Sequence, residues 1–254
     1  MDQEIVKLLY TNEDGEIDSL RDAQLMEEVD EARADAVCTL LSHADVFIRY
    51  QALLLALAWG RPQALQVFHA LLAQAPVFEF ALEPDRIYGH DNYLDEMALA
   101  FYYYAEKTGE VEEILPVCHR FLALYPQRYF KSHFKYVLQS LSHHSLAADM
   151  SKAIHQSLKN SRVYQASQLL PPLAKHYAKS HAQLLDDLIH EFMRLPADHP
   201  NQRFNVAEAL RYLPQENYAN LMQWFLLKET EPGVIDEAKR SLEVWRQQGV
   251  APGF

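Results

Sequence analysis

The chain has 254 residues, of which 49% are hydrophobic and 23% are charged, and these proportions are typical of a folded, water-soluble protein. The longest unbroken apolar run, residues 52–59, is too short to cross a bilayer. The acidic start Met1-Asp2-Gln3-Glu4 differs from the basic start of a secretory signal, so we expect a cytoplasmic protein without membrane contact. Cys38 and Cys118 lie in amphipathic patterns, which predicts buried thiols rather than a disulfide.

The charge is spread unevenly along the chain, whose formal net charge is −12. Residues 1–127 hold 23 Asp and Glu against 8 Lys and Arg, whereas residues 128–254 hold 12 against 15. Residues 1–35 alone contain 12 acidic residues against three basic ones. A field of this kind repels nucleic acid and membrane surfaces and attracts basic partners. The alternative, that the acidic surface only keeps the protein soluble, stays open at this point.

The first 30 residues combine a short apolar cluster at residues 5–10 with an acidic turn at residues 12–15. Ser19, followed by Asp22 three residues on, resembles a capping box that opens a helix running through Val29. We expect residues 1–30 to form an acidic cap at the start of the chain, and a second helical pattern follows over residues 31–42.

The most informative stretch is residues 44–60, where a polar corner precedes an apolar helix. Ala52, Leu55, Ala56 and Trp59 follow the spacing of one helical face, and small residues on that face let a neighbouring helix approach closely. Gly60 fits the position just past a helix end, because glycine tolerates the left-handed conformation found there. The spacing predicts a corner followed by the inner helix of a helix pair.

Further helical patterns follow to the end of the chain. Asp91 fits the N-cap of a helix with core positions at Leu94, Ala98, Phe101 and Ala105, and Gly109 fits its stop. Pro171-Pro172 must kink or break the pattern in which it stands. The predicted helices cover residues 63–73, 91–106, 112–124, 128–141, 146–158, 161–177, 182–193, 203–213, 218–227 and 233–247.

The helical patterns repeat at irregular intervals. When the first turns of the expected inner helices are aligned, their last positions advance by 46, 36, 32, 41 and 31 residues, so a strict 34-residue repeat is excluded. The aligned positions are Ala52, Ala98, Phe134, Ala166, Ala207 and Ala238.

Over residues 30–248 the chain resembles the HEAT/armadillo-like superfamily of α-solenoids. Asp45-Val46-Phe47-Ile48-Arg49, followed by Ala52, is the best local match. The resemblance implies an all-α, right-handed HEAT-like α-solenoid of about five to six antiparallel helix pairs. It implies one domain over residues 1–254, with repeats over residues 31–248 and a concave face used for binding. It implies no particular chemistry, because solenoids of one shape serve many functions.

No motif in the sequence indicates catalysis or a cofactor. The twelve histidines include no pair four residues apart and no His-Glu-x-x-His, and there is no Cys-x-x-Cys. Nucleophile motifs and glycine-rich phosphate loops are absent as well. We therefore expect no catalytic residue, no metal and no cofactor.

The residues expected to bind a partner lie mainly on the helix at 91–106. Its core positions leave Asp95, Glu96, Leu99 and Tyr103 toward an exposed side, and tyrosines interleaved with carboxylates are typical of surfaces that accept basic proteins. A mixed-charge strip in the second half is a further candidate. The expected partner-binding residues are Tyr88, Asp91, Tyr93, Asp95, Glu96, Leu99, Tyr103, Arg203, Glu208 and Arg211.

These features favour a non-catalytic solenoid whose acidic concave face captures a basic protein. Small acidic solenoids of this kind occur among bacterial immunity proteins, so we expect a toxin or effector as the partner and no binding to nucleic acid. One alternative is a HEAT-like DNA glycosylase acting on alkylated bases, for which Trp59, Trp224 and Trp245 are available but the acidic first half is unfavourable. Another alternative is an assembly or regulatory scaffold.

Overall fold

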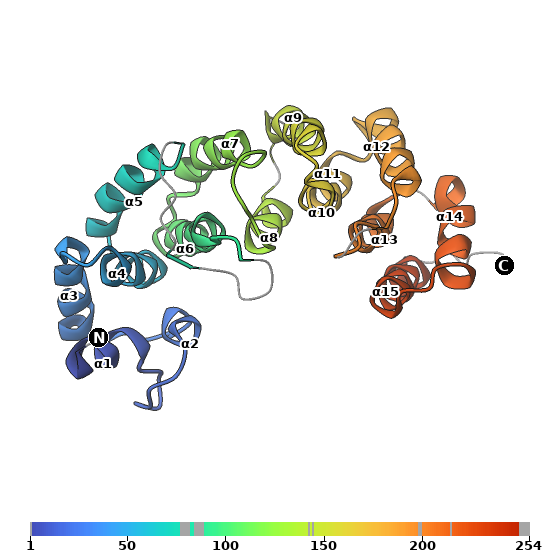
Figure 1. Cartoon of the computed structure of the whole chain (residues 1–254). Helices are drawn as coiled ribbons and strands as arrows, with labels where there is room; N and C mark the ends of the chain where they lie inside the picture. Colours follow the sequence, from blue (N-terminus) through green and yellow to red (C-terminus); the bar gives the residue numbers. More distant parts are fainter. Residues whose placement is uncertain are drawn as a thin grey trace. The chain divides into compact units, whose positions relative to one another are not determined.

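The computed structural model describes residues 2–76, 82–83, 89–141, 143, 145–197, 200–213 and 215–248. Every regular element in these ranges is a helix, and one isolated antiparallel bridge joins Thr11 to Ile17. The all-α class expected from the sequence is therefore confirmed (Figure 1). None of the helices in these ranges has the length and apolarity needed to span a membrane.

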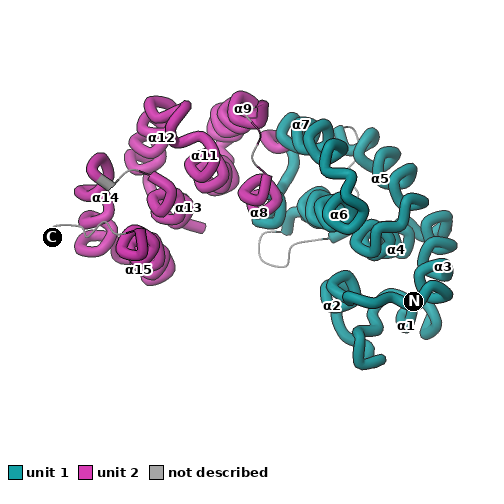
Figure 2. Tube along the Cα trace, turned by 180° about the vertical axis from the view of Figure 1, so that it is seen from behind, with its two compact units in different colours: residues 1–124, 128–134 teal, residues 125–127, 135–254 magenta. Residues whose placement is uncertain are grey.

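The chain forms two compact units, coloured separately in Figure 2. Unit 1 comprises residues 1–124 and 128–134, and unit 2 comprises residues 125–127 and 135–254. By sequence, unit 1 carries 23 Asp and Glu against 10 Lys and Arg, whereas unit 2 carries 12 against 13. The negative charge of the protein is therefore a property of unit 1.

Unit 1 is built around two helices that pack against each other, α4 and α6 (Figure 1). Helix α5 packs on α4, α7 packs on α6, and the short helices at the start of the chain also contact α4. The helices of unit 1 are α1 (Gln3–Tyr10), α2 (Leu20–Gln24), α3 (Glu31–Thr39), η1 (Leu40–Ser42), α4 (Val46–Ala58), α5 (Gln63–Gln74), α6 (Tyr93–Thr108), η2 (Val111–Glu113) and α7 (Ile114–Leu124).

Unit 2 repeats this arrangement, with α13 packed against both α11 and α15. Helix α12 packs on α11 and α13, and α14 packs on α15. Helix α8 (His133–Ser140) begins in unit 1 and continues in unit 2. The remaining helices are α9 (Ser145–Lys159), α10 (Val163–Ser167), α11 (Leu170–Tyr177), α12 (Ala182–Arg194), α13 (Arg203–Ala209), η3 (Leu210–Tyr212), α14 (Gln215–Leu227) and α15 (Pro232–Gln247).

The six aligned positions of the repeat pattern all lie in the core. Ala52, Ala98, Phe134, Ala166, Ala207 and Ala238 are buried. Five of these positions are Ala, whose small side chain lets an adjacent helix approach closely, and Phe134 is the exception. Trp59 is buried as expected, and its Nε1 donates a 2.8 Å hydrogen bond to the carbonyl of Ala23.

Several local predictions are confirmed and two are wrong. Gly60 and Gly109 have positive φ angles of 74° and 78° where α4 and α6 end, and Pro171 and Pro172 stand in the first turn of α11 after a break. The helix expected to run from Ser19 through Val29 ends already at Gln24. The helix expected over residues 128–141 begins only at His133.

Candidate partner-binding surface

Asp95 was expected to face solvent, and this expectation is wrong because its side chain is fully buried. Its carboxylate accepts backbone hydrogen bonds from Ser132 at 3.1 Å, His133 at 3.0 Å and Phe134 at 2.8 Å. These N–H groups belong to the start of α8, where a helix leaves its first donors without partners. Burial raises the pKa of Asp95. The charge of His133 and the backbone hydrogen bonds lower this pKa, but the net shift is upward. Asp95 therefore acts as an N-cap contributed by another helix.

Leu99 was also expected to be exposed, but both Leu99 and Tyr93 are buried. The physical reason is that α6 packs on α4 and on α7, so its buried stripe is wider than the spacing of its core positions suggested. The carbonyl of Tyr93 accepts a 3.2 Å hydrogen bond from the buried Tyr50 hydroxyl. These two residues belong to the core of unit 1 and not to its surface.

Two other expected residues, Glu96 and Tyr103, are partly exposed but have internal contacts. Glu96 Oε1 lies 3.0 Å from His133 Nδ1, and the Arg21 guanidinium lies over the Tyr103 ring at 5.7 Å. Burial lowers the pKa of His133, but the hydrogen bond and charge of Glu96 and the charge of Asp95 outweigh it, so the net shift is upward. Glu96 and Tyr103 therefore tie α6 to neighbouring segments.

Asp91 is half-buried and organises the backbone before α6. Its carboxylate accepts hydrogen bonds from the N–H groups of Leu82 and Glu83, both at 2.9 Å, and of Tyr93 at 3.2 Å. The N-cap of α6 is Asn92, one residue later than the sequence indicated, but Asp91 accepts the N–H of the first helical residue, Tyr93. Tyr88, the remaining expected residue of this region, lies outside the described residues.

In unit 2 the expected mixed-charge strip is engaged within the protein. Glu208 is buried, and its carboxylate pairs with Lys135 Nζ at 2.7 Å. Arg203 pairs with Glu229 at 3.4 Å and Arg211 pairs with Glu237. These residues are three to five positions apart along α13 and η3, and each ion pair fixes that segment to another part of unit 2. The exposure expected for Glu208 is wrong.

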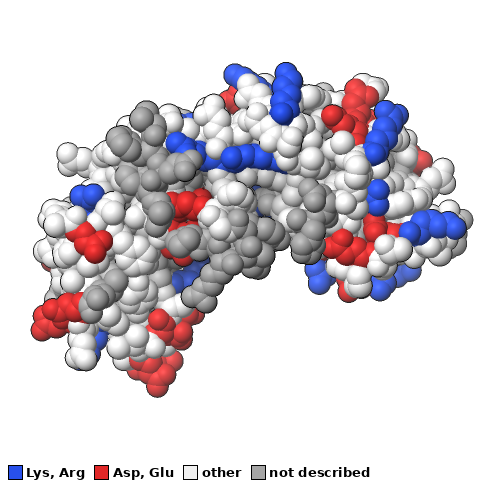
Figure 3. All heavy atoms as spheres, viewed as in Figure 1, with Lys and Arg blue, Asp and Glu red and all other residues white. Residues whose placement is uncertain are grey.

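Most of the exposed carboxylates that the structure describes in unit 1 lie instead at the start of the chain. All twelve acidic side chains between residues 2 and 35 are exposed, and Figure 3 shows acidic residues gathered over the end where α1 and α2 lie. Glu31, with Arg61 at 2.8 Å, is the one of the twelve whose carboxylate pairs with a cation in the described part of the chain. We call this set the N-terminal acidic surface: Asp2, Glu4, Glu13, Asp14, Glu16, Asp18, Asp22, Glu27, Glu28, Asp30, Glu31 and Asp35.

Arg21 and Arg33 lie in the same stretch of sequence, but neither pairs with these carboxylates in the described part of the chain. Arg33 donates to the carbonyl of Leu8 through Nε at 3.1 Å and to that of Thr11 through Nη2 at 2.7 Å. Burial lowers the pKa of Arg33, and its guanidinium lies over the Trp59 ring at 5.2 Å. Arg21 is likewise occupied, with Nη2 3.4 Å from His133 Nε2. The carboxylates are thus left to solvent or to a partner.

Two large apolar side chains stand among these carboxylates. Ile17 is 58% exposed and Leu25 is 54% exposed. Leu25 is exposed because α2 ends before it, so the side chain no longer lies on the buried face of a helix. The helix expected from Ser19 through Val29 would have included Leu25.

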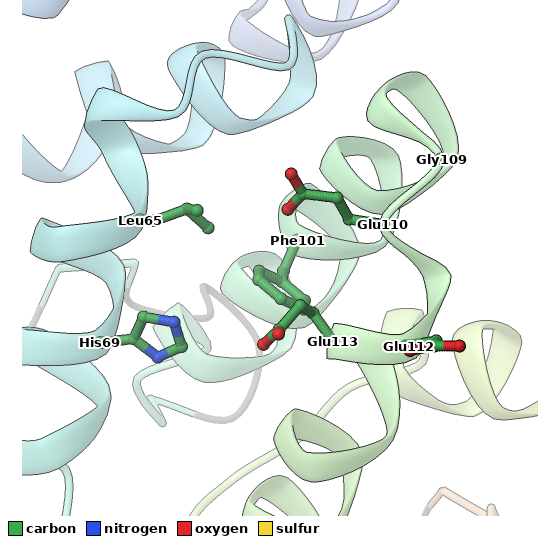
Figure 4. A pocket seen from close by; sticks show the side chains of 7 residues that line it. All are labelled: Leu65, His69, Phe101, Gly109, Glu110, Glu112 and Glu113. Atoms are coloured by element: carbon green, nitrogen blue, oxygen red, sulfur yellow. The ribbon is translucent and has the colours of Figure 1, made fainter.

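A separate hollow of about 600 Å³ lies between α5, the end of α6 and η2 (Figure 4). Leu65 and Phe101 give it an apolar part, and Figure 4 shows Glu110 and Glu113 reaching toward α5 while Glu112 points away. Glu110 Oε2 accepts a 3.2 Å hydrogen bond from the buried Tyr104. No spacing in the sequence signals that Glu110 and Glu113 reach toward α5, because their convergence depends on helix packing.

Within the ranges that the structure describes, no three His, Cys, Asp or Glu side chains are grouped so that they could hold a metal ion. Comparison with known protein families, with curated proteins and with solved structures finds no match for this chain.

Proposed function

We propose that this protein is a non-catalytic binding protein and that unit 1 captures a basic protein partner. The observation that carries the proposal is the N-terminal acidic surface, whose carboxylates are exposed and, apart from Glu31, lack cationic partners among the described residues. Such a surface accelerates encounter with a basic partner by electrostatic steering. Ile17 and Leu25 supply apolar area that a docked partner would remove from water.

The hollow of Figure 4 fits the same type of partner. A Lys or Arg side chain can lay its aliphatic stem against Leu65 and Phe101 while its charge meets the carboxylates of Glu110 and Glu113. This site therefore suits one inserted basic side chain, whereas the N-terminal acidic surface suits a wider basic patch.

The finer architecture belongs to the same proposal. A right-handed HEAT-like solenoid of five to six helix pairs is supported by the packing of α4 on α6 in unit 1 and of α13 on α11 and α15 in unit 2. The specific role that we expect, by analogy of kind alone, is that of a cytoplasmic immunity protein that occludes a basic toxin.

A DNA glycosylase fits the side chains less well. Trp59 and Trp245 are buried, and each donates its Nε1 hydrogen to a backbone carbonyl, at 2.8 and 2.9 Å. Indoles held in this way do not stack on a nucleic-acid base. Trp224 is partly exposed but has the Arg203 guanidinium over its ring at 5.2 Å.

A scaffold role differs from the main proposal because a scaffold would bind several partners weakly.

The first test is affinity capture with the tagged chain from its native cells, followed by kinetics with the purified captured protein. Glu16→Lys/Glu28→Lys reverses two exposed carboxylates that have no other contact in the described chain. Glu191→Lys/Glu243→Lys changes the net charge equally at exposed positions of unit 2. We expect the first pair to slow association by about tenfold at low salt and the second pair to change it little.

An acidic partner, or a basic partner whose association rate responds equally to both pairs, would contradict this placement of the binding surface. Retention of nucleic acid that is released by salt would instead favour the glycosylase.

A further inference from the structure

Unit 2 contains a hollow whose charge is opposite to that of the rest of the protein. It has a volume of about 770 Å³ and lies between the end of α11, the start of α12, η3 and the residue after α15. This volume is within the range of small-molecule sites. The lining residues that carry the argument are Lys175, His176, Lys179, Arg211, Tyr212 and Leu213.

Three cations line this hollow, and no carboxylate does so among the described residues. Lys175 and Lys179 are exposed, and neither ammonium forms an ion pair within the described chain. Lys175 stands in the last turn of α11, and Lys179 lies two residues beyond its end. Arg211 reaches the hollow from η3, a different segment.

Helix-end electrostatics explain only part of this arrangement. Lysine is favoured in the last turn of a helix, which accounts for Lys175 on α11. It does not account for a third cation contributed by η3, or for the lack of lining carboxylates in a unit that carries 12 Asp and Glu against 13 Lys and Arg. Arg211 is held in place by its ion pair with Glu237 on α15, so its guanidinium is already oriented before any ligand arrives.

The remaining lining groups suit an organic molecule. His176 Nε2 lies 2.8 Å from the carbonyl of Gln139, so this nitrogen carries the proton and, in the neutral ring, Nδ1 is left as an acceptor. Burial lowers the pKa of His176, and the charge of Lys175 lowers it further, which favours the neutral ring. Tyr212 and Leu213 offer an aromatic and an aliphatic wall.

We infer that this hollow binds a small organic phosphate. Its two unpaired ammonium groups and one oriented guanidinium match the charge and the acceptor oxygens of a phosphate or diphosphate. The neutral His176 and the wall formed by Tyr212 and Leu213 match a polar and an apolar part of the attached group. This site is independent of the partner surface of unit 1.

The test uses isothermal titration calorimetry on the full chain, with pyrophosphate and adenosine diphosphate as probes. Both are expected to bind with one site per chain, and adenosine diphosphate is expected to bind more tightly because it can also contact the walls of the hollow. Lys175→Gln/Lys179→Gln should weaken both probes by about tenfold or more, since charge-assisted hydrogen bonds to phosphate are lost.

Lys152→Gln/Lys159→Gln is the matched control, because it removes the same charge from exposed positions on α9. Equal weakening by both double variants, or no saturable binding of either probe, would overturn the inference. A short oligothymidylate distinguishes a free phosphate from a nucleic-acid backbone, and tighter binding of the oligonucleotide than of pyrophosphate would also overturn it.

Discussion

The carboxylate of Asp95 on α6 accepts a 2.8 Å hydrogen bond from the backbone N–H of Phe134, at the start of α8. The two residues are 39 positions apart, and both are fully buried. One side chain thereby caps a helix from another part of unit 1. The same carboxylate also receives the N–H groups of Ser132 and His133.

Asp95→Asn should destabilise the protein by about 2 kcal/mol, because a buried N–H that loses its acceptor retains its desolvation cost. Asparagine keeps the shape of the side chain but has only one acceptor oxygen for three N–H groups. Urea unfolding measures the change. Asp45→Asn is the control: Asp45 caps α4 at an exposed position, where asparagine caps equally well, so a change below about 0.5 kcal/mol is expected. Equal losses in both variants would contradict the role of Asp95.

His133 should make the stability of the protein depend on pH. Its pKa is raised in the folded protein, so its contribution is fully present below the unfolded value of about 6.5 and is lost as the pH rises through the folded pKa. Glu96 and Asp95 face the ring on one side and Arg21 on the other.

The measurement compares urea midpoints at about pH 6 and about pH 8 for the wild type and for His133→Gln. The wild type should lose more stability than the variant on going to the higher pH. His176, whose pKa is lowered, acts in the opposite direction and is common to both proteins, so it cancels in the comparison. An identical pH dependence of the two proteins would contradict the expected shift.

The sequence predicted those features that depend on local chemistry. Helix ends at Gly60 and Gly109, the break before Pro171-Pro172 and the burial of the aligned alanines follow from spacing along the chain. The start of α8 was misplaced in the prediction. Ser132, directly before it, is a residue type favoured at an N-cap, but the carboxylate that accepts the first N–H groups of α8 belongs to Asp95, 37 positions earlier in the chain. Leu99 was misassigned because the width of the buried face of α6 depends on how many helices pack on it.

The sequence predicted a negatively charged candidate surface but not the residues that form it. The acidic excess of residues 1–35 was evident from composition, and all of its carboxylates are exposed. Which acidic residues become buried, such as Asp95 and Glu208, depends on partners far along the chain and could not be predicted from spacing. Tyrosines alternating with carboxylates indicated an interface on α6, but the same pattern serves internal packing.

The ion pair of Lys135 and Glu208 should be costly to break from one side. Both side chains are buried, and Glu208 Oε1 also accepts a 2.8 Å hydrogen bond from Gln139. Lys135→Met leaves the Glu208 carboxylate without its cation, which should destabilise the protein by about 3 kcal/mol. Lys135→Met/Glu208→Gln should recover at least about 1 kcal/mol, because the buried negative charge is gone while Gln139 keeps an acceptor. A double variant less stable than Lys135→Met would contradict this account.

A side chain added at Gly60 should destabilise the folded protein, whereas one added at Gly233 should stabilise it. Gly60 has a φ angle of 74°, and an added Cβ would lie 3.1 Å from Lys107 Cγ. Gly60→Ala should therefore lower the free energy of unfolding by about 1–2 kcal/mol. Gly233 stands in the first turn of α15 with open space around it, so Gly233→Ala should stabilise the protein by about 0.5 kcal/mol. Thermal unfolding of the two variants tests the contrast, and changes of the same sign would refute it.

Ile17 and Leu25, which stand among the carboxylates of the N-terminal acidic surface, should affect how fast the partner dissociates. The carboxylates should affect how fast it associates. Ile17→Ser/Leu25→Ser removes exposed apolar contacts without changing the charge, so dissociation of the captured basic protein should accelerate by about tenfold while association stays nearly constant. Leu227→Ser, which changes a similarly exposed leucine in unit 2, should leave both rates unchanged. Surface plasmon resonance with the purified partner measures both rates. Slower association at an unchanged dissociation rate would show that Ile17 and Leu25 do not anchor the bound partner, because lost short-range contacts shorten the lifetime of a complex rather than delay its formation.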